Sequence, residues 1–384
     1  MIDFEKLPYF EEFIDPETGV KSYILKQDQA KCTQSFYFTN QSMSADQKYL
    51  WMYCFFPPLR QRCLGVVSLD PENPFVRVFK EVGFYDATPL VAPEGDKVYF
   101  VEGGYGPGCC FSAMVCTVDV NGNVEKFAQM DSEYLGGRVV LRFGTHLTIS
   151  ADGKDMLIEG FAGSIGFVSL LDMETRKFRV INEFMNHHDH GQFSPVDPEL
   201  FLIDQDGWSD PNSGRRLAFQ NRMWLCDRAG TRFEPVLRQS WFAHDGSKIC
   251  HDFWSFDGYI CWIDYDKGAY EMHPETRELH HIWKHPLCHA HCNADRSLWV
   301  ADQTPYEWAE RPCRMIFFNR ATEKTVDIYS ALPEPFCGRG KWHIDPHPQF
   351  TPDGNYIVST TTVHDQVAIS VTPVAQLVEL TKGE

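Results

Sequence analysis

The sequence predicts an all-β protein of one particular architecture, a seven-bladed β-propeller. Three observations predict it. A turn signal of the type Ser-Ala-Asp-Gly recurs seven times along the 384 residues, each copy lies beside short apolar runs, and the copies are on average about 51 residues apart. That spacing accommodates four strands, the content of one blade. A two-domain β-sandwich is the alternative, and seven copies in line count against it.

Each turn signal contains an acidic residue that marks its position. In three copies the acid is an aspartate followed by glycine, and Asp-Gly between two apolar runs favours a hairpin. The seven marker residues are Asp46, Glu94, Asp152, Asp197, Asp257, Asp295 and Asp353. A further pair of strands follows each hairpin, as in residues 167–178 and 314–325. Each repeat therefore predicts one four-stranded sheet.

The two ends of the chain complement each other. Residues 15–25 read as a lone hairpin arm before the first marker, whereas the last repeat has no clear strand after residues 367–371. We therefore expect the strand near residues 17–26 to complete the last blade, so that residues 1–384 form one closed ring. Closure removes the open sheet edges that a linear array would expose.

Composition narrows the function classes. The chain has 35 basic and 53 acidic side chains, a net charge of −18, which argues against nucleic-acid binding. An anionic ligand then needs a local cationic pocket or a metal. No apolar stretch is long enough to span a membrane, and the start does not resemble a signal peptide. Thirteen cysteines without a CxxC pair predict reduced thiols and a cytoplasmic protein, whereas the oligomeric state stays open.

Histidines recur at one position of the repeat. Five of the seven repeats carry a histidine six or seven residues before the marker, although only 15 of the 384 residues are histidine. The five are His146, His190, His251, His289 and His347. In a propeller this strand is the innermost, so we expect these side chains to line the mouth of the central channel. One such histidine would more often be structural, but five indicate that they bind a ligand, a proton or a metal.

Two of these segments carry further ligand-type side chains. Strand alternation would put His343, Asp345 and His347 on one face, and His289 with His291 on one face of the neighbouring blade's strand. The cysteines on either side of this histidine pair would then face blade packing. Imidazole and carboxylate groups from two blades can hold a divalent metal, Mn²⁺ first and Zn²⁺ second. The alternative is a hydrogen-bonded polar plug without metal.

Arginines stand near the same mouth. Arg222 begins a strand after a polar segment, and its guanidinium fork suits a carboxylate. Arg216 lies in the loop just before that strand. Alternatively, Arg222 bridges two blades.

Five short segments occur in an informative order. They are Asp15-Pro-Glu-Thr-Gly19, Arg222-Met-Trp-Leu, His251-Asp-Phe-Trp-Ser-Phe-Asp-Gly258, Ser297-Leu-Trp-Val-Ala-Asp302 and Pro346-His-Pro-Gln-Phe-Thr-Pro352. Their order and spacing resemble the oligogalacturonate lyases, seven-bladed propellers that cleave short pectin fragments. The resemblance spans nearly the whole chain.

The resemblance implies particular roles. In that family an arginine at the Arg222 position is the proposed proton abstractor. A manganese ion is held by histidines at the His289 and His347 positions, with a further histidine and a glutamine nearby.

This sequence departs from the family at the metal site. The family's His-Pro-His-Pro reads Asp345-Pro-His-Pro348 here, and Trp342 stands where the glutamine would be. We expect His343 and Asp345 to complete a four-ligand site with the two histidines. A relative that acts on another uronate glycan would show the same departures.

The implied reaction is β-elimination on an acidic oligosaccharide. A base removes the proton α to a uronate carboxylate, and the glycosidic oxygen leaves. Because the pKa of a guanidinium is very high, His251 and His190 are as good candidates for proton transfer as Arg222.

Several side chains are expected to contact the sugar, either through polar groups or by stacking an aromatic ring. These substrate-binding residues are His146, Arg216, Trp254 and Tyr306, and Trp342 is a further stacking candidate. For the aromatic residues, packing in the protein core is an alternative of equal weight to stacking on a sugar.

Two other function classes stay open. A glycoside hydrolase would need two carboxylates beside the bond, for which Asp189, Asp252 and Asp345 are available. A non-catalytic binding propeller would not need five histidines at one height.

Overall fold

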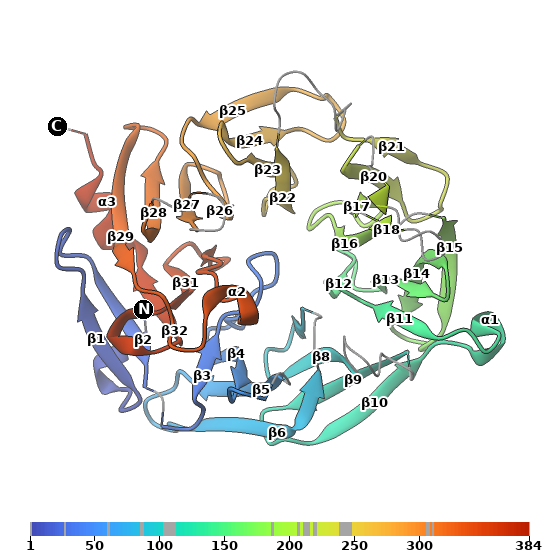
Figure 1. Cartoon of the computed structure of the whole chain (residues 1–384), viewed down its shortest axis with the longest axis horizontal. Helices are drawn as coiled ribbons and strands as arrows, with labels where there is room; N and C mark the ends of the chain where they lie inside the picture. Colours follow the sequence, from blue (N-terminus) through green and yellow to red (C-terminus); the bar gives the residue numbers. More distant parts are fainter. Residues whose placement is uncertain are drawn as a thin grey trace.

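Seven β-sheets of four or five strands are arranged as blades around a central axis (Figure 1). The seven-bladed propeller predicted from the sequence is thus confirmed. This computed structural model describes residues 2–26, 28–59, 62–84, 88–102, 113–185, 188–205, 208–209, 216–217, 221–237, 248–304, 308 and 311–383. In every blade neighbouring strands are antiparallel. The strands labelled β16, β22 and β26 in Figure 1 lie nearest the centre of the ring in their blades.

The first three blades follow the predicted repeat. Blade 1 contains, from the centre outward, β3 (Cys32–Gln34), β4 (Tyr49–Phe55), β5 (Arg62–Ser68) and β6 (Val76–Phe84). Blade 2 contains β7 (Leu90–Val91), β8 (Lys97–Glu102), β9 (Met114–Asp119) and β10 (Val124–Gln129). Blade 3 contains β11 (Val140–Phe143), β12 (Thr148–Ile149), β13 (Asp155–Ala162), β14 (Ile165–Asp172) and β15 (Phe178–Phe184), and the short helix α1 (Ser132–Leu135) precedes it.

The next three blades repeat this order. Blade 4 contains β16 (His188–Phe193), β17 (Leu200–Gln205), β20 (Met223–Asp227) and β21 (Phe233–Pro235), with β18 (Trp208–Ser209) and β19 (Arg216–Leu217) as a separate pair. Blade 5 contains β22 (Ile249–Trp254), β23 (Ile260–Asp264), β24 (Gly268–Met272) and β25 (Leu279–Trp283). Blade 6 contains β26 (Ala290–Cys292), β27 (Leu298–Gln303), β28 (Cys313–Asn319) and β29 (Lys324–Leu332).

Blade 7 joins the two ends of the chain. Its strands are β30 (Gln349–Phe350), β31 (Tyr356–Thr361), β32 (Ala368–Pro373), β2 (Lys21–Leu25) and β1 (Phe10–Ile14). Ile24 pairs with Ser370, so the N-terminal hairpin adds two outer strands to the C-terminal sheet. The remaining short helices are η1 (Phe4–Lys6), α2 (Arg339–Trp342), η2 (Val363–Asp365) and α3 (Val374–Leu380).

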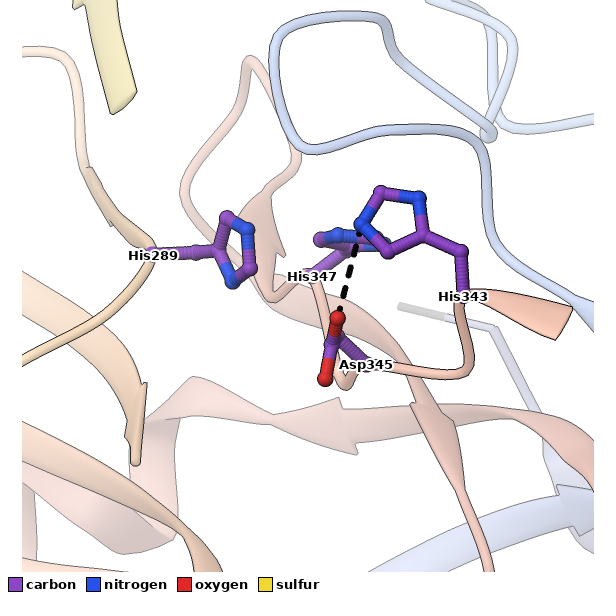
Figure 2. A group of neighbouring side chains, drawn as sticks. All are labelled: His289, His343, Asp345 and His347. Carbon is purple, nitrogen blue, oxygen red and sulfur yellow. Dashed lines mark ion pairs between the residues drawn. The ribbon is translucent and has the colours of Figure 1, made fainter. Parts of the chain in front are cut away.

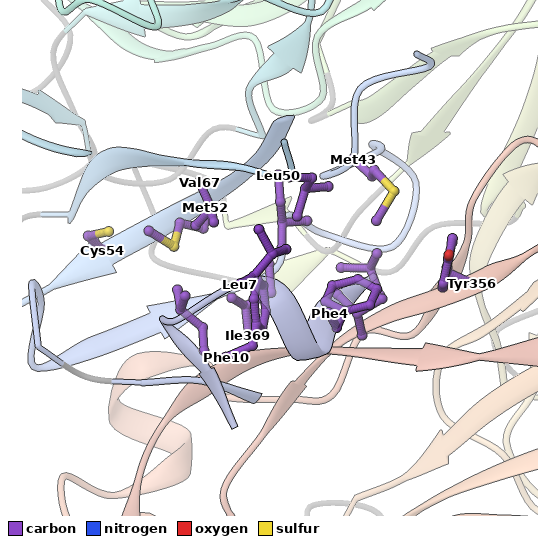
Figure 3. Close-up of a cluster of buried hydrophobic side chains, with 14 of the residues drawn as sticks. Phe4, Leu7, Phe10, Met43, Leu50, Met52, Cys54, Val67, Tyr356 and Ile369 are labelled. Atoms are coloured by element: carbon purple, nitrogen blue, oxygen red, sulfur yellow. The ribbon is translucent and has the colours of Figure 1, made fainter. Parts of the chain in front are cut away.

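Apolar side chains pack between the N-terminal segment, blade 1 and blade 7 and stabilise the closed ring. Figure 3 shows Phe4, Leu7 and Phe10 of the N-terminal segment packed against Leu50 of blade 1 and Ile369 of blade 7. All five are buried. Burial of such side chains contributes about 1.5–3 kcal/mol each, so the contact between the first and last blades is strongly stabilised. Among the residues that the structure describes, no helix is long and apolar enough to cross a membrane.

The loop of residues 35–42, between β3 and β4, crosses the centre of the ring, and we name it the central loop. The Asn40 amide donates to the carbonyl oxygens of Pro89 (3.1 Å) and Leu147 (2.8 Å), in blade 2 and in the loop before β12 of blade 3. Phe38 is buried against Phe253 of blade 5. The central loop therefore contacts several blades at the middle of the ring and forms part of the wall of the site.

One glycine leaves no room for a side chain. Gly268 has a φ of 119°, and a Cβ added there would lie 1.8 Å from the carbonyl oxygen of Trp283. We expect Gly268→Ala to lower the free energy of unfolding by about 3 kcal/mol, because both strain and a backbone clash act. Urea denaturation measures this. The matched variant Gly19→Ala, at φ 73° with nothing within 4 Å, should lose only about 1 kcal/mol. Equal losses would contradict the clash.

Candidate functional site

A cavity of about 360 Å³ lies at the centre of the ring and is lined in part by the central loop. Its lining is strongly polar and basic. The lining residues are Gln34, Ser35, Tyr37, Tyr53, Arg62, Thr88, Arg142, Thr145, His146, His190, Arg222, Cys250, His251, Tyr265, His343 and His347. No acidic side chain is among these described residues, although the chain as a whole is acidic.

Unusual backbone conformations direct the histidines toward this cavity. His190, His251, His343 and His347 all have a positive φ, between 43° and 53°. In blades 4 and 5 the inner strand has a register shift at this position, between Asp189 and Gln192 and between Cys250 and Phe253. Such bulges re-aim side chains, and strained residues of this kind concentrate at functional sites.

Tyr37 of the central loop lies among the imidazole rings. Its ring stacks on His146 with 4.9 Å between the centroids and meets His347 edge-on at 4.8 Å. The rings of His190 and His289 lie at 6.2 Å and 5.8 Å. Burial raises the pKa of the Tyr37 phenol well above its usual value, so the phenol keeps its proton at neutral pH.

Four predicted metal ligands come together beside the cavity (Figure 2). One ligand atom from each of His289, His343, Asp345 and His347 lies within 4.8 Å of the other three. We name these residues the metal-ligand group. His289 approaches from blade 6, whereas the other three come from the loop after α2. Three imidazoles and one carboxylate suit a divalent transition metal.

The polar partners of this group fit a metal. Asp302 accepts a hydrogen bond from Nδ1 of His289 (3.1 Å), which leaves Nε2 free to coordinate. The same carboxylate accepts the backbone N–H of His347 at 3.2 Å. Nε2 of His347 is buried and has no hydrogen-bond partner among the described residues. A buried polar atom without a partner is costly, and a bound cation would satisfy it.

The local structure that presents the group differs from the prediction. The expected inner strand through His343, Asp345 and His347 is wrong: α2 ends at Trp342, and β30 begins only at Gln349. The prolines at 346 and 348 have no N–H for a ladder, and Arg339 holds the loop by donating to the carbonyl oxygen of Ile344 at 2.6 Å. The four side chains are brought together by this loop instead of by strand alternation.

His291 also departs from the expected alternation. It does not point with His289 but stacks on Phe253, with 5.2 Å between the rings, and accepts the backbone N–H of Phe350 at 3.2 Å. Burial lowers its pKa to about 3. Cys292 is buried in packing as expected, whereas Cys288 lies near His251 and His289, with which it forms a second group of potential ligands.

Arg222 lies above two buried carboxyl groups. Its Nη2 is 2.8 Å from Oδ2 of Asp204, and its Nε is 4.0 Å from Oδ1 of Asp252. Burial raises the pKa of both carboxyls, that of Asp204 the more strongly. The proximity of the two acids favours one shared proton between them. Arg222 thus connects blades 4 and 5 and also faces the cavity.

A second ion pair holds His190. Asp189 is completely buried, 2.6 Å from Nη1 of Arg142 and 2.5 Å from Nδ1 of His190. Burial opposes protonation of His190, but the adjacent Asp189 carboxylate outweighs it and raises the pKa of the imidazole above 6.5. Next to it, burial and the proximity of His190 lower the pKa of His146 well below its usual value. The cavity therefore contains one imidazole whose pKa is raised beside one whose pKa is lowered.

His251 has a defined tautomer. Its Nδ1 lies 2.7 Å from the carbonyl oxygen of Cys288. A carbonyl only accepts hydrogen bonds, so Nδ1 carries the proton and Nε2 presents a lone pair. Nε2 lies 3.5 Å from the Tyr265 hydroxyl. The ring stacks on His289 with 4.0 Å between the centroids.

The predicted sugar-stacking residues do not gather at the cavity. Trp254 is buried in the core, and its indole N–H donates to the carbonyl oxygen of Gln192. Trp342 is buried against Phe55. Both expectations are wrong, because these rings fill the space within and between blades. Tyr306 lies outside the described residues, and for Arg216 only the backbone, in β19, is described.

The sequence did not single out several residues of the site. Tyr37 and Arg62 lie outside the repeat signal that drew attention to the histidines. The aspartates had a usable signal, because Asp204 and Asp302 each end an otherwise apolar strand run, in β17 and β27. A charged residue at such a position is rarely buried without a partner.

Fold and site together define a class of protein: a seven-bladed propeller with a basic, histidine-rich central cavity beside a group that can hold a metal. No family model matches the chain. A curated oligogalacturonide lyase from Pectobacterium atrosepticum is 22% identical over an alignment 390 positions long. The alignment covers 89% of this chain and 94% of that protein. The resemblance seen in the sequence is therefore confirmed.

Solved structures agree with this relation. An oligogalacturonate lyase from Vibrio parahaemolyticus has a TM-score of 0.73 at 20% identity, over 95% of this chain and 96% of that one. An oligogalacturonate lyase in complex with manganese has a TM-score of 0.74, also at 20% identity and with the same coverage. At this identity the likeness of the structures establishes the fold.

Proposed function

We propose that this protein is a lyase that cleaves uronate-containing oligosaccharides, with oligogalacturonides as the first substrate class, by β-elimination. One observation carries most weight: a chain with a net charge of −18 encloses a cavity lined by three arginines and five histidines. Such a cavity is suited to an anionic ligand. The similarity to oligogalacturonide lyases supports a uronate as that ligand.

Charge neutralisation is the first requirement of the reaction. The proton α to a carboxylate becomes removable only when the negative charge that develops on the carboxylate is stabilised. We assign this role to Arg222. A guanidinium stays protonated in proteins, which favours carboxylate binding over proton abstraction.

The metal-ligand group fits Mn²⁺, with Zn²⁺ or another divalent cation as the second choice. His289, His343, Asp345 and His347 would hold the ion. When bound, it would supply Lewis-acid stabilisation of a substrate carboxylate.

We assign proton abstraction to Nε2 of His251, because the hydrogen bond to Cys288 fixes the tautomer with its lone pair there. The proton passes from the sugar carbon to Nε2, and the electron pair of the C–H bond forms the new double bond. The bond between the neighbouring carbon and the glycosidic oxygen breaks, and that oxygen takes a proton from His190. The products are a shortened sugar chain and an unsaturated uronate.

Two further assignments accompany this function. His146 has a buried Nδ1 without a hydrogen-bond partner among the described residues, which supports a role in substrate binding, and Arg216 stays a proposed contact. Eleven cysteines of the described chain are free, and reduced thiols support a cytoplasmic location.

The structure disfavours a glycoside hydrolase. That reaction needs two carboxyl groups flanking the bond. Asp189 and Asp252 are buried near arginines, and Asp345 belongs to the metal-ligand group. None of the three lines the cavity.

The decisive experiment incubates the protein and Mn²⁺ with oligogalacturonides and with other uronate oligosaccharides. We expect ultraviolet absorbance from the new double bond to rise together with the number of reducing ends. Reducing ends without absorbance would identify a hydrolase. Binding without either signal would identify a non-catalytic propeller.

The raised pKa of His190 predicts a pH dependence. Because the cationic form donates the proton, the rate should fall as the pH rises through the folded pKa, which lies above 6.5. The groups that face His190 are Asp189, Asp204, Arg222, His146, His251 and Tyr37. Among them, Asp189 is the carboxylate that favours its positive charge most. His190→Gln should remove this alkaline limb from the pH–rate profile.

The raised pKa of His190 also predicts that the free energy of unfolding falls as the pH rises. A raised folded pKa contributes stability that is fully present below the unfolded pKa of about 6.5 and is lost as the pH rises through the folded value. Urea denaturation of the wild type and of His190→Gln across this range measures the difference. An unchanged alkaline limb in the variant would assign the limb to another group.

A further inference from the structure

Arg62 differs from the other arginines that line the cavity. Arg142 lies 2.6 Å from Asp189, and Arg222 lies 2.8 Å from Asp204. Arg62 forms no ion pair with a carboxylate among the described residues. Among the three arginines of the cavity wall, Arg62 is therefore the one that pairs with no acidic side chain of the described residues.

The guanidinium of Arg62 is nevertheless held in place. It lies over the ring of Tyr53, 5.1 Å from the centroid, and near that of Phe55 at 6.0 Å. Its Nη2 donates to the carbonyl oxygen of Trp342 at 2.6 Å. Aromatic contact fixes the plane of a guanidinium, and one hydrogen bond leaves most of its five N–H groups available.

The position of Arg62 connects the cavity to the metal-ligand group. The loop of residues 343–348, between α2 and β30, carries three of the four metal ligands, and we name it the ligand loop. Trp342 immediately precedes it, so the hydrogen bond to the Trp342 carbonyl anchors Arg62 next to the ligand loop. A ligand at this wall therefore meets a fixed cation beside the metal-ligand group.

We propose that Arg62 binds a carboxylate of the acidic sugar and makes the cavity selective for uronates over neutral sugars. The inference rests on the proposed function for the identity of the ligand. Both oxygens of a carboxylate accept N–H groups from the free edge of the guanidinium, the geometry for which arginine is suited. A neutral sugar ester offers no charge to this edge.

The test compares D-galacturonate with its methyl ester, which have the same ring and no glycosidic bond to cleave. Binding of both is measured by calorimetry on the Mn²⁺-treated protein. The variant Arg62→Gln should bind galacturonate about 10- to 100-fold more weakly, with the methyl ester and Mn²⁺ bound as in the wild type. With trigalacturonate, KM should rise more than kcat falls.

Two further variants complete the design. Arg77→Gln, on the outer strand β6 of the same blade, is the matched control, because Arg77 also lies over an aromatic ring, that of Phe75, and donates to a backbone carbonyl. It should bind both ligands as the wild type does. Arg62→Lys keeps the charge but not the fork, and its affinity for galacturonate should be intermediate.

Equal weakening of both ligands in Arg62→Gln would overturn the proposal and make Arg62 a support of the ligand loop. Unchanged selectivity in a variant that still cleaves trigalacturonate would overturn it and leave the lyase function in place. Conversely, selective galacturonate binding through Arg62 without cleavage of any uronate oligosaccharide would support the carboxylate site and overturn the lyase function. Galacturonate that does not bind to the wild type would overturn the proposal.

Discussion

Arg222→Ala lowers kcat/KM for oligogalacturonide cleavage about 100- to 1,000-fold, by analogy with the loss of one transition-state donor. Its Nη2 contacts Asp204 and its side chain faces the cavity, so the substitution removes the charge that meets the substrate carboxylate. Arg222→Lys should recover little, because an ammonium group cannot bridge an aspartate and a carboxylate ligand in the same way. Initial rates from the absorbance of the double bond measure both.

Folding must be separated from catalysis in this variant. Removal of Arg222 leaves two buried carboxyl groups without their cation, which destabilises a fold by about 3–5 kcal/mol. The pair Arg222→Met with Asp204→Asn should restore stability but not activity. Arg228→Ala is the matched control, because Arg228 follows the same strand and pairs with Asp155 away from the cavity.

His251→Ala should reduce the rate at least as much as Arg222→Ala if Nε2 is the proton acceptor. Its ring is anchored by the carbonyl of Cys288, so the loss would concern the chemical step and not the loop geometry. Near wild-type turnover in both variants, on a substrate that the protein cleaves, would place the active site elsewhere.

The double substitution His289→Ala with His347→Ala abolishes binding of Mn²⁺ and, with it, activity. Two of the four clustered ligands are lost, and the remaining His343 and Asp345 come from one loop. Elemental analysis and the Mn²⁺ resonance signal measure occupancy independently of turnover. Asp302→Asn should weaken binding about 10- to 100-fold, because Asp302 orients His289.

The control for the metal prediction is the double variant of His280 and His281 on the outer strand β25. It should retain Mn²⁺ and activity. If wild-type protein supplied with Mn²⁺ and then Zn²⁺ holds neither, the histidines contact the substrate directly.

The repeat pattern was sufficient to predict the ring and the height of the histidines. Markers such as Asp152 and Asp257 form the turns after the inner strands. A distance of six or seven residues before the marker placed His146, His190 and His251 around one cavity. The prediction succeeds because all blades have the same strand arrangement, so residues at equivalent positions of the repeat lie at equivalent positions in the ring.

Residues outside the repeat were beyond such a prediction. Tyr37 and Phe38 enter the centre on a loop whose path is set by contacts with other blades. The ligand loop was misassigned as a strand, because alternation holds only for residues in a ladder and prolines 346 and 348 prevent one. Trp254 and Trp342 were misassigned because a ring that stacks on a sugar and one that packs in a core have the same sequence signature.

The central loop gives the molecule a hub. Propeller blades contact mainly their neighbours, so a ring of repeats can lose one blade while others persist. Here Tyr37, Phe38 and Asn40 of the central loop contact several other blades around the axis. Local unfolding of any of these blades therefore removes contacts that hold the same loop. The protein should therefore unfold as one cooperative unit, and enzyme activity and far-ultraviolet circular dichroism should disappear at the same urea concentration.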